Sequence, residues 1–206
     1  MTVSPLSLSR RRDRQSSAVV AFALIALLGG AGALLPVAGA TELLTNGDFE
    51  APLIEGWTTE SSGYGVLFDR ATTYEPDLDY EVKVAKATGT GFARLSQTVE
   101  LPGLDAVLSA DLSVSATATV TAWAAAVLAI EYLDETGHRL GETYIGDLSR
   151  YCPWVSGDAL HLIEVDPSVW ATHSLTLDEE LANLPAVDPF AVRAVRVSLL
   201  AYVEDC

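Results

Sequence analysis

The sequence predicts an all-β protein: two antiparallel sheets packed as a sandwich, with one short helix before the last strand. Past Trp57 the chain consists of short runs in which apolar and polar residues alternate, separated by clusters of turn-forming residues. The stretch 112–130 carries no charge and begins with a period of two, and a Val-rich run over 190–203 closes the chain. A chain of 206 residues can bury one adequate core, so we expect one domain.

The strands expected in the first half can be taken in order. Residues 63–70 alternate and predict a strand, whereas residues 71–79 lack apolar periodicity, carry three acids and predict a loop. Strands over 80–84 and 91–101 follow. Pro102 and Gly103 end the second of these, since both residues disfavour continued pairing.

The uncharged stretch 112–130 has a second interpretation, as a membrane span. Its first half is rich in Ser, Thr and Ala, and apolar and hydroxyl residues alternate over 112–116, which is the period of a strand. The second half, 123–130, could be helical by propensity. Residues 131–141, however, continue as strand, turn and strand. We therefore expect strands here and no membrane span.

The second half of the chain repeats this pattern. Residues 143–146 continue a strand, and a loop over 147–158 follows. The segment 178–184 fits one short helix, because acidic residues in a first turn interact favourably with the helix dipole and Pro185 follows the segment. Two further strands are expected in this half, over 160–165 and 170–177.

The chain begins with the pattern of a secretory signal. Four arginines lie between positions 10 and 14, an apolar run spans 18–35, and small residues in an A-x-A arrangement end at Ala40. Cleavage after Ala40 would leave residues 41–206 as the β-sandwich domain, in a secreted, extracellular or cell-envelope protein. A retained membrane anchor is the alternative.

Acidic residues dominate the composition. The chain has 12 basic and 28 acidic residues and a formal net charge of −16. Removal of residues 1–40, which hold four arginines and one aspartate, would leave 8 basic and 27 acidic residues, a net charge of −19. This sign excludes a nucleic-acid surface and disfavours anionic membranes. It suits cation binding or neutral sugars, and simple solubility explains it equally well.

Two cysteines are present, Cys152 and Cys206. In an oxidising compartment two cysteines are expected to pair, and closing a loop of 54 residues would contribute about 4 kcal/mol in the chain-entropy model. Free thiols or an intermolecular bridge are the alternatives. A zinc site is not expected, because the sequence has no CxxC and its three histidines lack ligand spacing.

The stretch 43–52, LLTNGDFEAP, is the most distinctive of the chain. Asn46 and Gly47 predict a turn, because both residues tolerate the left-handed backbone region. Asp48 and Glu50 place two carboxylates beside backbone carbonyls in a tight bend, as calcium sites do. Solvated turn acids are the alternative.

This opening, followed by Gly56 and Trp57, resembles the start of galactose-binding-like jelly-roll modules, including carbohydrate-binding modules of families four, nine and twenty-two. The resemblance extends to strand 91–101 and to the hairpin 131–141. It implies a jelly-roll sandwich, a sugar-binding role, and a structural calcium held by Glu50 together with an acid on the last strand, here Asp205.

No enzyme signature is present: the sequence has no G-x-S-x-G, H-E-x-x-H or P-loop. We therefore expect a non-catalytic, monomeric module that binds an oligo- or polysaccharide by stacking aromatic rings on sugar faces. Trp57, Trp123 and Trp170 are expected in the core. The aromatic residues expected on loops or an open sheet face, where they could bind sugar, are Tyr64, Tyr74, Tyr80, Tyr144, Tyr151 and Trp154.

Two other functions remain open. The sandwich could serve as a structural or adhesive envelope protein without a glycan site, or as a small extracellular glycan-active enzyme. The lack of an attached catalytic domain in this sequence weakens the sugar-binding interpretation, because such modules normally target an enzyme. Glycan binding would distinguish the module from the structural protein.

Overall fold

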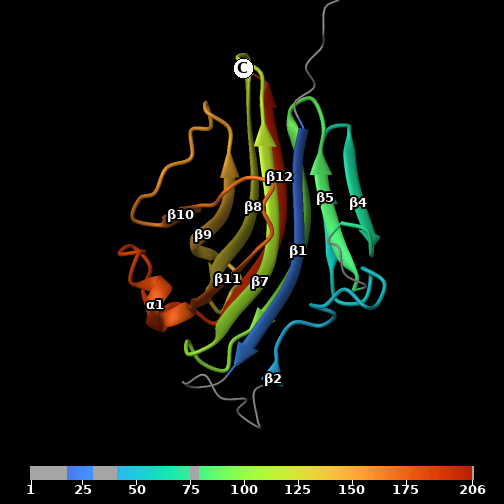
Figure 1. The fold of residues 1–206 in the computed structure, drawn as a ribbon. Helices are drawn as coiled ribbons and strands as arrows, with labels where there is room; N and C mark the ends of the chain where they lie inside the picture. The colour runs from blue at the N-terminus through green and yellow to red at the C-terminus, as the bar shows by residue number, and fades with distance from the viewer. Residues whose placement is uncertain (1–17, 30–40, 75–78, 206) are drawn as a thin grey trace, which may run out of the picture.

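Two six-stranded sheets packed face to face make up the structure (Figure 1). The computed structural model describes residues 18–29, 41–74 and 79–205. Sheet A has the order β11-β7-β1-β5-β4, with β2 paired to β1, and sheet B has the order β10-β9-β8-β12-β6-β3. The predicted all-β sandwich is confirmed.

The strands of sheet A all pair antiparallel. They are β1 (Ala18–Gly29), β2 (Thr41–Glu42), β4 (Val66–Ala71), β5 (Glu81–Lys86), β7 (Val107–Thr117) and β11 (Ala171–Thr176).

The strands of sheet B pair antiparallel except β10, which runs parallel to β9. They are β3 (Thr58–Ser61), β6 (Gly91–Glu100), β8 (Ala122–Leu133), β9 (Arg139–Leu148), β10 (Leu160–Glu164) and β12 (Ala194–Asp205). A helix, α1 (Leu177–Leu181), and a 3₁₀ turn, η1 (Pro189–Ala191), lie between β11 and β12.

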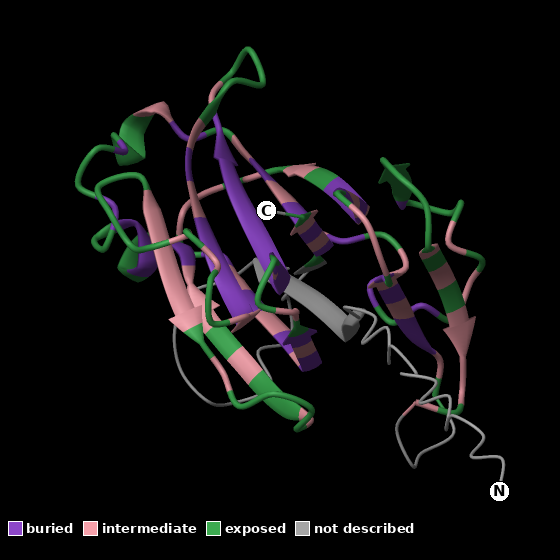
Figure 2. Cartoon of the chain, turned by 90° about the horizontal axis from the view of Figure 1, so that it is seen from above, coloured by how far each residue is buried: buried purple, intermediate pink, exposed green. Residues whose placement is uncertain are grey.

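The core lies between the two sheets, and Figure 2 shows its buried strands in purple. Every second residue of β8 points into it, including Leu128, Ile130 and Tyr132, all with 0% exposure. From sheet A, Leu112 and Val114 pack against them. Full burial of one such aliphatic side chain contributes roughly 1.5–3 kcal/mol.

The uncharged stretch 112–130 forms the end of β7 and most of β8, as the alternation predicted. In the described part of the chain, no helix has the length and apolar character that a membrane crossing requires. The predicted helix over 178–184 is present as α1, although α1 is shorter and begins one residue earlier, at Leu177.

The opening motif forms the predicted turn. Asn46 adopts φ +53°, and its side chain accepts a hydrogen bond from the Ala51 amide (2.8 Å) and donates one to the Ala51 carbonyl (3.1 Å). Phe49 and Trp57 are buried, with ring centroids 5.2 Å apart, and Trp57 Nε1 donates to the Asn46 carbonyl (2.8 Å). The expected core position of Trp57 is confirmed.

Residues Ala18–Gly29, the described part of the apolar run in the predicted signal, form a strand. β1, blue in Figure 1, lies in the centre of sheet A between β7 and β5. Residues 1–17 and 30–40 lie outside the described residues, so cleavage after Ala40 stays a prediction.

Candidate functional site: an aromatic face on sheet B

Four aromatic side chains meet on the outer face of sheet B, which points away from the core. We call Trp123, Tyr144, Trp154 and Tyr202 the aromatic cluster. Trp123 lies on β8, Tyr144 on β9 and Tyr202 on β12, while Trp154 comes from the loop between β9 and β10. The Trp154 centroid lies 5.1 Å from Tyr144, 5.6 Å from Trp123 and 5.8 Å from Tyr202.

The strand pattern explains why the rings gather here. Because side chains alternate across a strand, Trp123, Val127 and Ala129 all point outward from β8 while their neighbours enter the core. β8 is thus apolar on both faces. A second, smaller core has formed on the outer side from Val127, Ala129, Tyr144 and Leu200, with Trp154 and other side chains packed over it: Phe92, Leu148, Leu160 and Leu162.

The cluster has a buried part and an open part. Tyr144 is only 6% exposed, whereas Trp123, Trp154 and Tyr202 are half-buried and keep ring surface in contact with solvent. A hydrogen bond from the Tyr202 hydroxyl to Glu204, together with burial, raises the pKa of Tyr202 to about 12. The hydroxyl therefore stays protonated at neutral pH.

A network of ion pairs adjoins the aromatic cluster on the same face. Glu131 is 4% exposed and lies near three arginines: Arg196 at 3.0 Å, Arg139 at 3.7 Å and Arg94 at 3.8 Å. Glu142 accepts hydrogen bonds from Arg139 (2.7 Å) and from the Tyr144 hydroxyl (2.8 Å). The bond from the Tyr144 hydroxyl to Glu142 joins the network of ion pairs to the aromatic cluster.

Arg94 is the least engaged cation of this network. Its two ion pairs, with Glu131 and Glu60, span 3.8 and 3.9 Å, beyond normal hydrogen-bond length. Within the described residues, its N–H groups make no hydrogen bond to either carboxylate. Its Nε is buried without a hydrogen-bond partner, and the side chain is 21% exposed, so the terminal N–H groups are the donors that a ligand hydroxyl could reach.

The six aromatic residues predicted to bind sugar are divided between two parts of the molecule. Tyr144 and Trp154 lie in the aromatic cluster, and Tyr151, in the same loop, is 50% exposed. Tyr64, 70% exposed, lies instead on the connection before β4. The other two, Tyr74 and Tyr80, lie between β4 and β5, and the Arg70 guanidinium stacks on the Tyr80 ring at 3.3 Å.

Sequence reasoning missed Trp123 and Tyr202. The expectation that Trp123 belongs to the core between the sheets is wrong, because its side chain lies on the outer face against Trp154 and Tyr202. A signal was available. Counting every second residue from Trp123 leads to Glu131, and a charged residue marks that face as the outer one.

A hollow of 450 Å³ lies on sheet A. Tyr74 and Trp170 line it together with Lys83 and small residues of β7, and Trp170 Nε1 donates to the Tyr74 carbonyl (3.3 Å). Trp170 is half-buried and outside the core, so its expected core position is wrong. The hollow combines aromatic and polar groups but has no cluster of stacked rings like that on sheet B.

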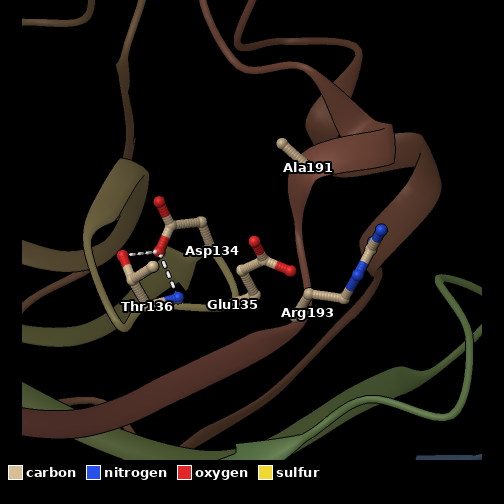
Figure 3. Close-up of a pocket in the computed structure, with 5 residues that line it drawn as sticks. All are labelled: Asp134, Glu135, Thr136, Ala191 and Arg193. Atoms are coloured by element: carbon tan, nitrogen blue, oxygen red, sulfur yellow. Dashed lines mark hydrogen bonds between the residues drawn. The ribbon is translucent and has the colours of Figure 1, made fainter.

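Another hollow, of 310 Å³, lies beside the β8–β9 turn (Figure 3). Its lining residues are Asp134, Glu135, Thr136, Ala191 and Arg193. Asp134 Oδ1 accepts bonds from the Thr136 amide (2.8 Å) and hydroxyl (2.7 Å), so this carboxylate stabilises the turn. No described aromatic ring lines the hollow, which makes it a poor platform for a sugar.

The three acids predicted to hold calcium do not come together. Glu50 accepts a hydrogen bond from the Tyr80 amide, just before β5, whereas Asp205 donates its amide to Thr90, after the far end of β5. Asp48 accepts the Glu50 amide (3.3 Å) in the opening turn, and all three side chains are exposed. Within the described residues no group of three or more acidic, His or Cys side chains is placed to hold a metal. The proposed set therefore does not fit a calcium ion, and calcium binding stays a prediction.

The predicted disulfide lies partly outside the described residues. Cys152 is half-buried in the loop that carries Trp154, and Cys206 is not described. The Ser149 amide bonds to the Ala124 carbonyl, and Ala122 pairs with Asp205. The loop of Cys152 and the end of β12 thus lie at the same end of sheet B, and the bridge stays a prediction.

Comparisons with known proteins give fold likeness only. No protein-family model matches the chain, and no curated protein matches it. Among solved structures, the family 11 carbohydrate-binding module from Clostridium thermocellum in complex with a β-1,3-1,4-mixed-linked tetrasaccharide is 13% identical, with 77% of this chain and 89% of that chain covered at a TM-score of 0.31. The family 11 module of the cellulosomal cellulase Lic26A-Cel5E of C. thermocellum is also 13% identical, with 79% and 90% covered at a TM-score of 0.32. At these TM-scores the likeness carries no functional argument, so function must be inferred from the face itself.

Proposed function

We propose that the protein is a secreted, non-catalytic module that binds a neutral oligo- or polysaccharide on the aromatic face of sheet B. The observation that carries the proposal is the stack of Trp123 on Tyr202, both half-buried, with ring centroids 4.9 Å apart and 15° between the ring planes. The pair presents ring surface to solvent beside polar side chains, which is the combination that a sugar requires.

Sugars are recognised by two kinds of contact. The C–H groups on one side of a pyranose pack on an aromatic ring, and its hydroxyls form hydrogen bonds at the ring edge. Trp123, Trp154 and Tyr202 supply the rings. Arg94 and Glu204, which lie on β6 and β12, supply polar groups on the same face.

Charge favours a neutral sugar over an anionic one. The chain carries a net charge of −16, which repels polyanions. The local cations do not reverse this, because Arg139 and Arg196 already lie against Glu131 and Glu142. An uncharged glycan is not repelled by this negative charge.

Secretion and the lack of catalysis belong to the proposal as well. The apolar run behind the N-terminal arginines supports export. The aromatic face holds no arrangement of nucleophile, base and orienting group among the residues described here. Its carboxylates Glu131 and Glu142 are engaged with arginines.

A glycan array probed with the protein, followed by calorimetry on the glycans that bind, tests the proposal. We expect binding to at least one neutral glycan, and we expect Trp123→Ala to weaken it by about fivefold or more, since loss of a stacked aromatic contact costs at least about 1 kcal/mol. Tyr64→Ala is the control, because its 70% exposed ring lies near the Lys86 ammonium and outside the aromatic cluster, so its loss should leave binding unchanged.

Three results would decide against the proposal. Absence of binding across a broad array would favour the structural or adhesive envelope protein. Binding that Tyr64→Ala weakens as much as Trp123→Ala does would place the sugar elsewhere. Hydrolysis of a labelled polysaccharide would revive a glycan-active enzyme.

A further inference from the structure

β1 has an unusual position for a segment that reads as an export signal. It lies between β7 and β5, antiparallel to both, so β7 and β5 run in the same direction on either side of it (Figure 1). Neighbouring strands are about 4.8 Å apart, so loss of β1 would leave roughly 9–10 Å between β5 and β7. Backbone groups cannot form hydrogen bonds over that distance.

The pairing that β1 provides is extensive. Ala18–Leu28 pair residue by residue with Thr117–Val107 of β7, and Val19–Ala23 pair with Lys86–Val82 of β5. Without β1, the facing edges of two strands would leave their amides and carbonyls unpaired in the middle of a sheet. Unpaired strand edges of this kind are templates for another strand.

We call the space that loss of β1 would leave between β5 and β7 the gap. The register of β1 against β7 indicates which kind of segment could fill it. Alternate β1 positions pair with β7 residues that are buried in the core, whereas the intervening positions pair with hydroxyl and acidic residues on the outer face. The gap therefore selects an extended segment with an apolar residue at every second position. The core-side partners on β7 are Leu108, Ala110, Leu112, Val114 and Ala116, and the outer-side partners are Ser109, Asp111, Ser113, Ser115 and Thr117.

We propose that the gap between β5 and β7 is a strand-binding site. In the full chain its occupant is Ala18–Gly29, and when residues 1–40 are cleaved off it binds an extended segment of a different protein with apolar residues at alternate positions. Thr41 and Glu42 pair with Gly29 and Leu28 at the end of β1, so a single cut after Ala40 separates the strand from the chain that holds it. Binding adds a strand in the middle of a sheet, and its affinity comes from main-chain hydrogen bonds and alternate side-chain contacts.

The test starts from the full chain with a specific protease site placed within residues 30–40. After the cut, labelled peptides carrying the sequence of Ala18–Gly29 with solubilising ends are added and exchange into the site is measured by fluorescence anisotropy. Two neighbouring substitutions form a matched pair. Position 23 pairs with Leu112 and Val82 on the core side, and position 24 pairs with Asp111 on the outer side.

We expect the unchanged peptide and the Leu24→Lys peptide to bind, and the Ala23→Lys peptide to bind at least about a hundredfold more weakly, because it would bury an unpaired ammonium group. Hydrogen exchange should show β5 and β7 losing protection when the strand leaves and regaining it when the peptide binds. β12, in the other sheet, should change little.

Several results would overturn the proposal. Equal binding of the two lysine peptides would show adhesion without register. Retained protection of β5 and β7 without a peptide would show that the sheet closes by itself, and a dimer formed on cleavage would show that a second copy fills the gap. If the cut protein does not stay folded, the same two substitutions are made in the uncut chain and its melting temperature is measured. Equal melting temperatures for Ala23→Lys and Leu24→Lys would show that β1 does not pair with β5 and β7 in the proposed register. Glycan binding on sheet B does not depend on any of these outcomes.

Discussion

The rings of Trp123 and Tyr202 lie nearly parallel on the outer face of sheet B, with 4.9 Å between their centroids. The two residues come from neighbouring strands, since Trp123 pairs with Glu204 and Tyr202 with Ala125. The Tyr202 hydroxyl donates to Glu204, so the ring and the hydroxyl of Tyr202 have different partners. Separate substitutions can therefore distinguish the ring from its hydroxyl.

Tyr202→Phe should change sugar affinity by no more than about threefold, because the stacked ring remains, whereas Tyr202→Ala should lower it by about tenfold. Calorimetry with a glycan selected on the array measures both. The melting temperature of Tyr202→Phe provides the control for folding. Equal losses for the two variants would mean that the hydroxyl, and not the ring, makes the contact.

Glu131→Gln should lower the free energy of unfolding by roughly 2 kcal/mol, less than the ~3–5 kcal/mol of a fully buried pair because its arginines are partly exposed. The neutral amide leaves Arg94, Arg139 and Arg196 without their shared carboxylate. Urea unfolding measures the change. Glu60→Gln is the control, since Glu60 is 54% exposed and 3.9 Å from Arg94, and its removal should cost less than about 0.5 kcal/mol.

Cys152→Ser should lower the stability of the exported protein by about 4 kcal/mol if the bridge to Cys206 forms, because it opens a 54-residue loop. Intact mass before and after reduction checks the bridge directly, as reduction adds two hydrogens. Burial raises the pKa of the reduced Cys152 thiol, so alkylation at this position should be slow. A protein that reacts at once with thiol reagents, without reduction, would contradict the bridge.

Asp147 should give a pH-dependent contribution to stability. Burial raises the pKa of Asp147 above its usual value of 3.8, although its Oδ2 accepts the Ala116 amide at 2.6 Å. The folded state therefore holds this proton more tightly than the unfolded chain. The resulting stability is present below the unfolded pKa and is lost as pH rises through the folded one, by about 1.4 kcal/mol per unit of pKa difference.

Asp147→Asn removes this titration. Relative to the wild type, the variant should gain stability as pH rises from about 3 to about 7, and urea unfolding across that range measures the difference. A constant difference at all pH values would show that the carboxyl has the same pKa in both states.

The β-sandwich could be predicted from the sequence because alternating apolar and polar residues indicate strands, and turn-forming residues mark where the strands end. Residues 91–101 and β6 nearly coincide, and the turn at Asn46 forms as expected. The face of Trp123 could not be assigned by hydrophobicity, since β8 is buried on both sides. The separation of Glu50 from Asp205 depends on strand order, which no local pattern encodes.

The double burial of β8 has a consequence for how sheet B keeps its alignment. A slip of one residue in the register between β8 and β12 would move Leu128 from the core face to the outer face and bring Val127 and Ala129 into the core. Because all three side chains are apolar and buried, hydrophobic burial alone would oppose this slip only weakly. The slip would also carry Glu131 into the interior, away from Arg196, and turn Tyr132 out into water. The Glu131 carboxylate, near the end of an apolar strand, thus fixes the register of β8 and determines which of its side chains face the core.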